Sequence, residues 1–166
     1  MVELTLAQPV EAEDCYKIID FGRKFQQEQG FTQWTDDYPN YQTIKVDIRD
    51  SKGFVVKVDG ALAGYMCIDF DGEPAYDDID GAWRSSDPYA VVHRMAFAPD
   101  FCGKGLSGST WDLIKDYCRD RGVDYIRVDT DFPNERMQHV LEKNGFVRCG
   151  VITFQGSGKI AYDQIL

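Results

Sequence analysis

The feature that most constrains this fold is a strand that runs through a glycine-rich turn directly into a helix. Residues 89–98 have strand character and stop at Pro99, and residues 102–108 then open a helix with an apolar stripe formed by Leu106, Thr110, Leu113, Ile114 and Tyr117. The first-turn amides of a helix have no partner inside it, and the helix dipole favours an anion there. Glycine lets the backbone approach such an anion closely. We therefore expect a phosphate or pyrophosphate site, with Lys104 adding a mobile positive charge.

Two familiar glycine motifs do not describe this turn. A P-loop needs Gly, four residues and then Gly-Lys before Ser or Thr, which the segment lacks. The dinucleotide fingerprint G-x-G-x-x-G matches residues 103–108 only formally, because the segment lies far from the N-terminus and no long series of β-α-β units follows. Taken alone, the turn therefore fits either a phosphate cradle or a helix start that simply needs a tight turn.

The rest of the chain predicts one domain over residues 1–166, without repeats or a linker. Asp59-Gly60 between two apolar runs is typical of a type I′ hairpin turn, since both central residues of that turn need positive φ. A second hairpin is expected around Gly156-Ser157-Gly158, and the acidic segment 69–88 reads as a long loop. We expect strands at 4–6, 54–58, 61–68, 89–98, 123–130, 146–154 and 159–166, and helices at 15–30, 41–48, 106–117 and 134–144.

The charge and cysteine content exclude several classes of function. The chain holds 28 acidic and 18 basic residues, a net charge of −10, which disfavours nucleic-acid binding and suits a cationic small substrate. Its five cysteines are odd in number and widely spaced, so we expect reduced thiols in a cytoplasmic protein rather than disulfides or a zinc site. No apolar stretch is long enough for a membrane span, and the start carries no secretion signal.

The turn and a later helix resemble the GNAT superfamily of acyl-CoA-dependent N-acyltransferases. The family's loop reads Gln/Arg-x-x-Gly-x-Gly/Ala after a strand that ends in proline. This chain matches at Pro99 and Gly105 and departs from the pattern at Cys102 and Ser107. Both departures are mild, because the loop binds pyrophosphate mainly through backbone amides.

A second match lies in the helix that follows Asn134, which resembles the family's second helix because it carries Met137 and Leu141 and closes at Gly145-Phe146. The element order β-α-α-β-β-β-α-β-α-β-β also resembles that fold over nearly the whole chain. The resemblance implies a mixed α/β (α+β) fold. Its sheet would be twisted and mostly antiparallel, with about seven strands and helices on both faces.

The resemblance implies acetyl-CoA as cosubstrate and no metal. The strand before the turn would pair with the pantetheine through Met95, Ala96 and Phe97, where a backbone amide can polarise the thioester carbonyl. Asn134 would face the pantetheine arm. The phosphates would lie on the turn and the first helical residues, which are Cys102, Gly103, Lys104, Gly105, Leu106, Ser107 and Gly108.

The base that deprotonates the amine is expected on the same strand. His93 alternates with Met95 and Phe97 and so shares their face, although a structural histidine fits the pattern equally well. Glu73 and Asp129 are reserve candidates. Leu141 occupies the position where many members carry a tyrosine acid, so the general acid stays open.

The acceptor site is expected to combine aromatic walls with carboxylates. The resemblance places the substrate-binding residues Trp34 and Tyr38 in the loop between the first two helices, and Tyr76 in the acidic segment. A primary amine of a small molecule or peptide is the expected acceptor. A catalytically silent acyl-CoA sensor is the alternative. Exposed final strands often pair in this family, which makes a homodimer one option.

Overall fold

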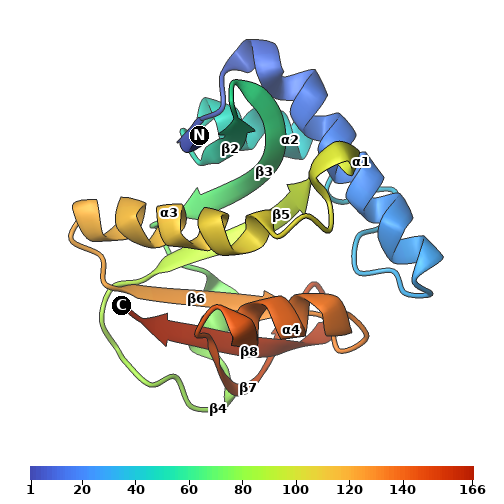
Figure 1. Ribbon diagram of the computed structural model, residues 1–166. Helices are drawn as coiled ribbons and strands as arrows, with labels where there is room; N and C mark the ends of the chain where they lie inside the picture. Colours follow the sequence, from blue (N-terminus) through green and yellow to red (C-terminus); the bar gives the residue numbers. More distant parts are fainter. The chain divides into compact units, whose positions relative to one another are not determined.

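The computed structural model describes residues 1–166 (Figure 1). These residues form two compact units. The first unit contains residues 1–68 and 93–114, and the second contains residues 69–92 and 115–166. Strand β5 (Ala90–Phe97) and helix α3 (Leu106–Asp120) each contribute residues to both units. The elements form a mixed α/β architecture with four α-helices and one mostly antiparallel sheet of eight strands.

The first unit combines antiparallel strands with two helices. Strands β1 (Val2–Leu6), β2 (Gly53–Val58) and β3 (Ala61–Asp69) are neighbours in that order, and β5 follows β3. The turn residues Asp59 and Gly60 have φ values of 50° and 85°, which confirms the predicted type I′ hairpin. Helices α1 (Ala12–Glu28) and α2 (Tyr41–Arg49) follow a short η1 (Pro9–Glu11). Their apolar faces and the sheet share one core, in which Ile19, Ile44, Val55 and Tyr65 are fully buried.

The second unit continues the sheet in the order β5-β6-β8-β7-β4. Its strands are β4 (Asp80–Gly81), β6 (Tyr125–Thr130), β7 (Val147–Phe154) and β8 (Ser157–Ile165). Strands β5 and β6 are parallel, because the chain returns between them through helix α3, whereas β6, β8, β7 and β4 pair antiparallel. Helix α4 (Glu135–Lys143) is seen in front of the strands of this unit in Figure 1.

Two details of the second unit differ from the sequence-based expectation. The segment 69–88 is not only loop, since it contains the short helix η2 (Pro74–Asp77) and the two-residue strand β4, which brings the strand count to eight instead of about seven. Strand β4 is too short to show an alternating pattern. The last hairpin turns at Gln155-Gly156, with φ values of 52° and 76°, so Ser157 and Gly158 already belong to β8.

Candidate active site

The predicted strand–turn–helix segment forms as expected, and the end of β5, the turn and the start of α3 belong to the first unit. The short helix η3 (Pro99–Phe101) follows β5. The Ala98 carbonyl before it accepts hydrogen bonds from the amides of Phe101 and Cys102 at 2.9 and 3.0 Å. Gly103 and Gly105 both have φ of 75°, a left-handed backbone that glycine adopts without strain. Helix α3 begins immediately afterwards, at Leu106.

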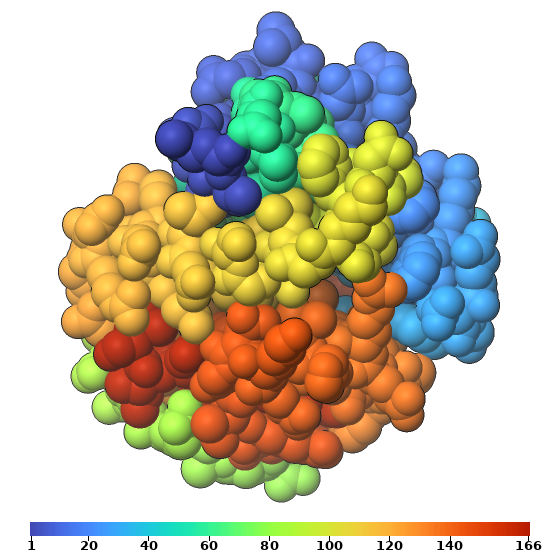
Figure 2. All heavy atoms as spheres, in the orientation of Figure 1, coloured from blue at the N-terminus to red at the C-terminus, as the bar shows by residue number.

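The turn is open on its outer side. A Cβ built on Gly105 would meet no other atom within 4 Å, and Gly103, Lys104 and Gly105 are exposed. In Figure 2 the yellow atoms of this part of the chain lie at the molecular surface. The first-turn amides of α3, including those of Ser107 and Gly108, have no intrahelical partner. The segment therefore offers several backbone donors around one exposed turn, which suits an anionic ligand.

The strand that precedes the turn is irregular at its centre. Arg94 has φ of 56°, a left-handed conformation that is uncommon for a residue with a side chain and is typical of a β-bulge. Beyond it, Phe97 packs so closely on Gly64 of β3 that a Cβ there would lie 2.8 Å from the Phe97 ring. Ala96 is buried in the core of the first unit. Met95 to Phe97 therefore follow an interruption of the strand and are held against β3.

The Arg94 side chain enters a buried polar cluster that the sequence analysis missed. Its Nε and Nη2 donate to the two carboxylate oxygens of Asp47 on α2, at 3.0 and 2.7 Å. Tyr65 on β3 donates to the same carboxylate at 2.7 Å. Burial and the Asp47 charge hold the pKa of Tyr65 far above its ordinary value, so its hydroxyl stays protonated as a donor. Asp47 shares the buried face of α2 with Ile44 and Ile48, and a charge on an apolar helical face was the signal available in the sequence.

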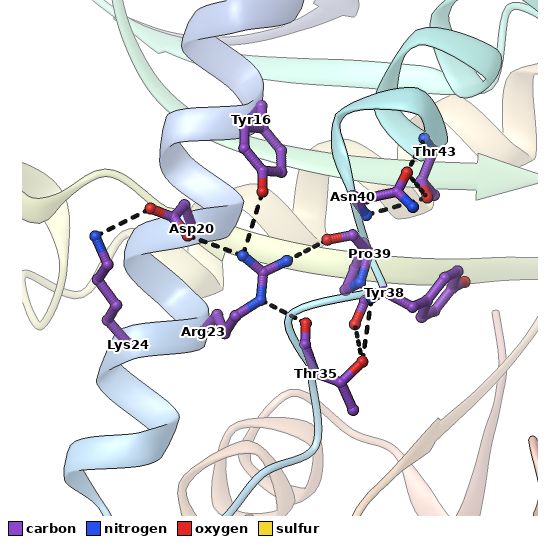
Figure 3. A network of polar contacts seen from close by, with 9 residues as sticks. All are labelled: Tyr16, Asp20, Arg23, Lys24, Thr35, Tyr38, Pro39, Asn40 and Thr43. Carbon is purple, nitrogen blue, oxygen red and sulfur yellow. Dashed lines mark hydrogen bonds and ion pairs between the residues drawn. The ribbon is translucent and has the colours of Figure 1, made fainter.

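The loop of residues 31–40 is fixed by a second buried arginine, Arg23 of α1 (Figure 3). Its guanidinium donates to the backbone carbonyls of Thr35, at 2.6 Å, and Pro39, and it pairs with Asp20 at 2.8 Å. Figure 3 shows the loop backbone converging on this side chain. The loop is therefore held through its backbone by a buried charged group.

The two predicted acceptor residues of this loop have defined positions. Trp34 packs against the core of the first unit, close to Gly22 of α1, and its amide donates to Gln26 at 3.0 Å. The hydroxyl of Tyr38 accepts from Nη1 of Arg94 at 2.7 Å. Burial raises the pKa of Tyr38 although the Arg94 charge opposes the shift. Tyr38 thus links the loop to strand β5.

In the second unit the structure brings together Glu73, Tyr76 and Asp129. The Tyr76 hydroxyl donates to Asp129 at 2.7 Å. Glu73 precedes η2, and its carboxylate accepts a hydrogen bond from the Ala75 amide at 3.3 Å. Burial raises the pKa of Asp129. The hydrogen bond from Tyr76 and the charge of Lys159 lower it, and the charge of Glu73 raises it. Burial and Asp129 raise the pKa of Tyr76 well above its ordinary value. Two carboxyl groups and a protonated phenol therefore lie in one electrostatically coupled cluster.

Aromatic packing supports this cluster. The Arg127 guanidinium lies 4.4 and 4.2 Å from the ring centres of Trp83 and Tyr89, and it donates to the Ser85 carbonyl at 2.8 Å. Trp83 donates to the Tyr76 carbonyl at 2.8 Å, and the Tyr89 hydroxyl accepts the Glu73 amide at 3.2 Å. Arg127 therefore orders the segment that carries Glu73 and Tyr76.

The remaining predicted residues have the following positions. His93 is half-buried on β5 in the first unit. Asn134 is buried in the second unit and caps α4, because its side-chain oxygen accepts the Met137 amide at 3.1 Å. Leu141 is buried in the core, so no hydroxyl is available at that position. Lys159 pairs with Asp131 at 2.8 Å, and the charges of both residues also act on Asp129.

Three of the five cysteines are small core residues, whereas Cys102 and Cys149 are partly exposed. Cys15, Cys67 and Cys118 are buried, and burial raises the pKa of Cys15 to about 12 and that of Cys118 to about 11. No group of three or more His, Cys, Asp or Glu side chains is arranged to hold a metal ion. None of the helices has the length and apolar character that a membrane crossing requires.

Comparison with known proteins identifies relatives over the whole chain. A streptothricin acetyltransferase of Streptomyces lavendulae is 26% identical over 103 residues, which are 61% of this chain and 48% of that protein. The chain therefore spans about half the length of the curated relative it matches. The crystal structure of a GNAT-family acetyltransferase from Streptococcus agalactiae is 31% identical and covers 99% of this chain and 95% of its own, with a TM-score of 0.92.

A more distant structure shares the fold. AAC(6′)-Ib in complex with ribostamycin and coenzyme A is 20% identical, with a TM-score of 0.73, over 99% of this chain and 93% of that one. The sequence model of the Acetyltransferase (GNAT) family matches residues 15–146. This match contains the strand, the glycine turn and the capped helix described above, and it shows that the chain belongs to the GNAT acetyltransferase family.

Proposed function

We propose that this chain transfers an acetyl group from acetyl-CoA to a primary amine of a small molecule or peptide. The observation that carries the proposal is the strand–turn–helix segment of the first unit. There, Gly103 and Gly105 adopt left-handed backbone at the start of α3, and the strand before them is interrupted at Arg94. Such a segment would supply backbone amide donors for the diphosphate of coenzyme A. It would also supply an irregular strand along which the extended pantetheine arm can lie.

The residues present fit coenzyme A. The exposed turn and the first turn of α3 would bind the diphosphate through backbone amides, with Lys104 as a counter-charge. The backbone of residues 95–97 would lie along the pantetheine arm. Asn134 stays a predicted cofactor contact, and its side-chain oxygen caps α4. Coenzyme A bound in AAC(6′)-Ib, a protein of the same fold, supports this assignment.

The chemistry is direct attack. The amine nitrogen forms a bond with the thioester carbonyl carbon, the carbon–sulfur bond breaks, and the sulfur leaves with its electron pair as coenzyme A thiolate. The amine proton must pass to a base, for which His93, Glu73 and Asp129 are the candidates. A backbone amide of residues 95–97 stabilises the developing negative charge on the carbonyl oxygen. The buried Leu141 supplies no proton, so we assign protonation of the thiolate to solvent.

A cationic acceptor fits the electrostatics best. The net charge is −10, and Glu73 and Asp129 lie in one cluster with Tyr76. An ammonium group is attracted by carboxylates and by aromatic faces. Streptothricin acetyltransferase and AAC(6′)-Ib with ribostamycin, both similar to this chain, favour a small-molecule amine as the acceptor.

The test is release of coenzyme A thiol from acetyl-CoA with a panel of polyamines, aminoglycosides, streptothricin and peptides. We expect turnover with at least one multiply charged amine, and we expect His93→Ala to lower it and flatten the pH–rate profile near neutrality. An unchanged profile removes His93 from the mechanism. Calorimetric binding of acetyl-CoA without turnover across the panel would instead support a silent acyl-CoA sensor, which Leu141 favours. No binding at millimolar concentrations would refute both.

A further inference from the structure

We propose that Arg94 is a positioning residue that couples the acceptor loop, residues 31–40, to the donor strand, residues 93–97. The inference rests on the proposed function for the roles of the two segments, whereas the coupling itself depends only on contacts within the first unit. Every contact that carries it lies inside that unit. Arg94 touches neither reactant in this scheme and acts through the segments it joins.

The donor-strand end of the coupling is the backbone of Arg94 itself. Its φ of 56° is unfavourable for a residue with a Cβ, so the surrounding structure must hold it there. The bidentate pair with Asp47 provides that restraint, because α2 and the Tyr65 hydroxyl fix the carboxylate. The Arg94 and Asp47 side chains are only 12% and 8% exposed, so water competes little for these hydrogen bonds.

The acceptor-loop end is the hydroxyl of Tyr38. Arg94 uses the one guanidinium nitrogen that Asp47 leaves available, Nη1, to donate to this hydroxyl at 2.7 Å. Tyr38 accepts this bond, so its own proton stays available for a further acceptor. Arg23 fixes the same loop at the backbone of Thr35 and Pro39, so the bond to Tyr38 positions an already ordered segment.

The three bonds use the planar geometry of arginine. A guanidinium presents donors in two directions at once, one pair toward Asp47 and one toward Tyr38, whereas a lysine ammonium is a point charge on a flexible stem. Lysine at position 94 would keep the positive charge beside Asp47 but could not hold both partners in this geometry. The Arg94→Lys variant therefore separates positioning from charge.

The experiment compares Arg94→Lys and Tyr38→Phe with Arg49→Lys, an exposed arginine on α2 that pairs with Asp50. Steady-state kinetics give KM for acetyl-CoA, KM for the amine, and kcat. For Arg94→Lys we expect both KM values to rise about tenfold, as for loss of a charge-assisted hydrogen bond, and kcat to fall. For Tyr38→Phe we expect only the amine KM to rise. Arg49→Lys should match the wild type.

Amide hydrogen exchange provides a readout that needs no substrate. Arg94→Lys should speed exchange in both residues 31–40 and residues 93–97, Tyr38→Phe should do so in residues 31–40, and Arg49→Lys should change neither. Unchanged exchange in both segments overturns the inference, as does an Arg94→Lys variant that loses thermal stability but keeps wild-type kinetic constants. If Arg94→Lys does not fold, Tyr38→Phe decides. If the wild type acetylates no amine, the proposed function fails, and the exchange result alone decides the coupling.

Discussion

Replacing Asp47 by asparagine is the most informative test of the buried cluster. The substitution keeps the shape of the side chain but removes the charge that faces Arg94. The carboxylate accepts two bonds from Arg94, at 3.0 and 2.7 Å, and one from Tyr65 at 2.7 Å. An asparagine offers one oxygen for these three donors and turns its own amide donor toward at least one of them.

The expected loss of stability follows from the burial of the pair. Breaking a buried ion pair by removing one partner costs about 3–5 kcal/mol, because the other charge stays buried without compensation. Asparagine retains one acceptor, so we expect the lower end, about 3 kcal/mol. With a urea m-value of about 2 kcal/mol/M, the unfolding midpoint should fall by roughly 1.5 M. Native domains have about 5–15 kcal/mol of stability, so the variant should still fold.

The matched control is Asp50→Asn. Asp50 lies next to the same helix and pairs with Arg49 at 2.9 Å, but both side chains are exposed, so solvent screens the pair. Both variants remove one negative charge from the same region, which cancels long-range effects of net charge. Urea unfolding followed by tryptophan fluorescence and by circular dichroism should shift the Asp47→Asn midpoint and leave the Asp50→Asn midpoint at the wild-type value. Equal midpoints in the two variants would refute the assignment of a stabilising buried pair.

Three further outcomes test the site. Gly105→Glu should weaken acetyl-CoA binding in calorimetry by about tenfold or more. Its urea midpoint should not fall below that of Gly105→Ala, because a Cβ at this position meets open space. Unchanged affinity would place the phosphates elsewhere. Gly64→Ala should also weaken binding, since its Cβ would lie 2.8 Å from the Phe97 ring; Gly158→Ala, with ordinary contacts of 3.7 Å or more, is the control. Asp129→Asn should gain stability relative to the wild type at neutral pH and lose that gain in acid. A carboxyl whose pKa is raised in the folded state lowers stability only at pH values above the pKa that it has in the unfolded chain. A stability difference between Asp129→Asn and the wild type that does not change with pH would contradict this.

Local patterns in the sequence predicted the elements that depend on local chemistry. The Asp59-Gly60 hairpin, the amphipathic helices α1 and α3 and the glycine turn before α3 each follow from residues close together in the chain. The cap of α4 at Asn134 is likewise local. The two-residue strand β4 was not predictable, because it depends on the close approach of Gly81 to Gly150, which are far apart in the sequence.

The sequence could not reveal the partners of buried charges. Arg94 and Asp47 are 47 residues apart, and only the packing of α2 beside β5 makes them a pair. The place of Asp47 on the apolar face of α2 indicates that its carboxylate needs a buried partner, but the sequence does not identify Arg94 as that partner. Trp34 and Tyr38 stay predicted acceptor residues, and the sequence does not show that Trp34 packs against the core or that Tyr38 accepts a hydrogen bond from Arg94. The long-range contacts that fix these side chains form only in the folded chain.

If Asp129 is the base of the proposed reaction, its surroundings set the pH dependence of turnover. A base works best when its pKa lies near the working pH. Burial and the charge of Glu73 raise the pKa of Asp129 in that direction, while the Tyr76 hydrogen bond and the charge of Lys159 oppose the shift. Removing the bond in Tyr76→Phe should therefore move the acid limb of the kcat/KM profile to higher pH. Removing the charge in Glu73→Gln should move it to lower pH. If both variants keep the acid limb of the kcat/KM profile at the wild-type pH, that limb arises from another group. His93 then becomes the base to test, because histidine is the side chain that ordinarily titrates near neutrality.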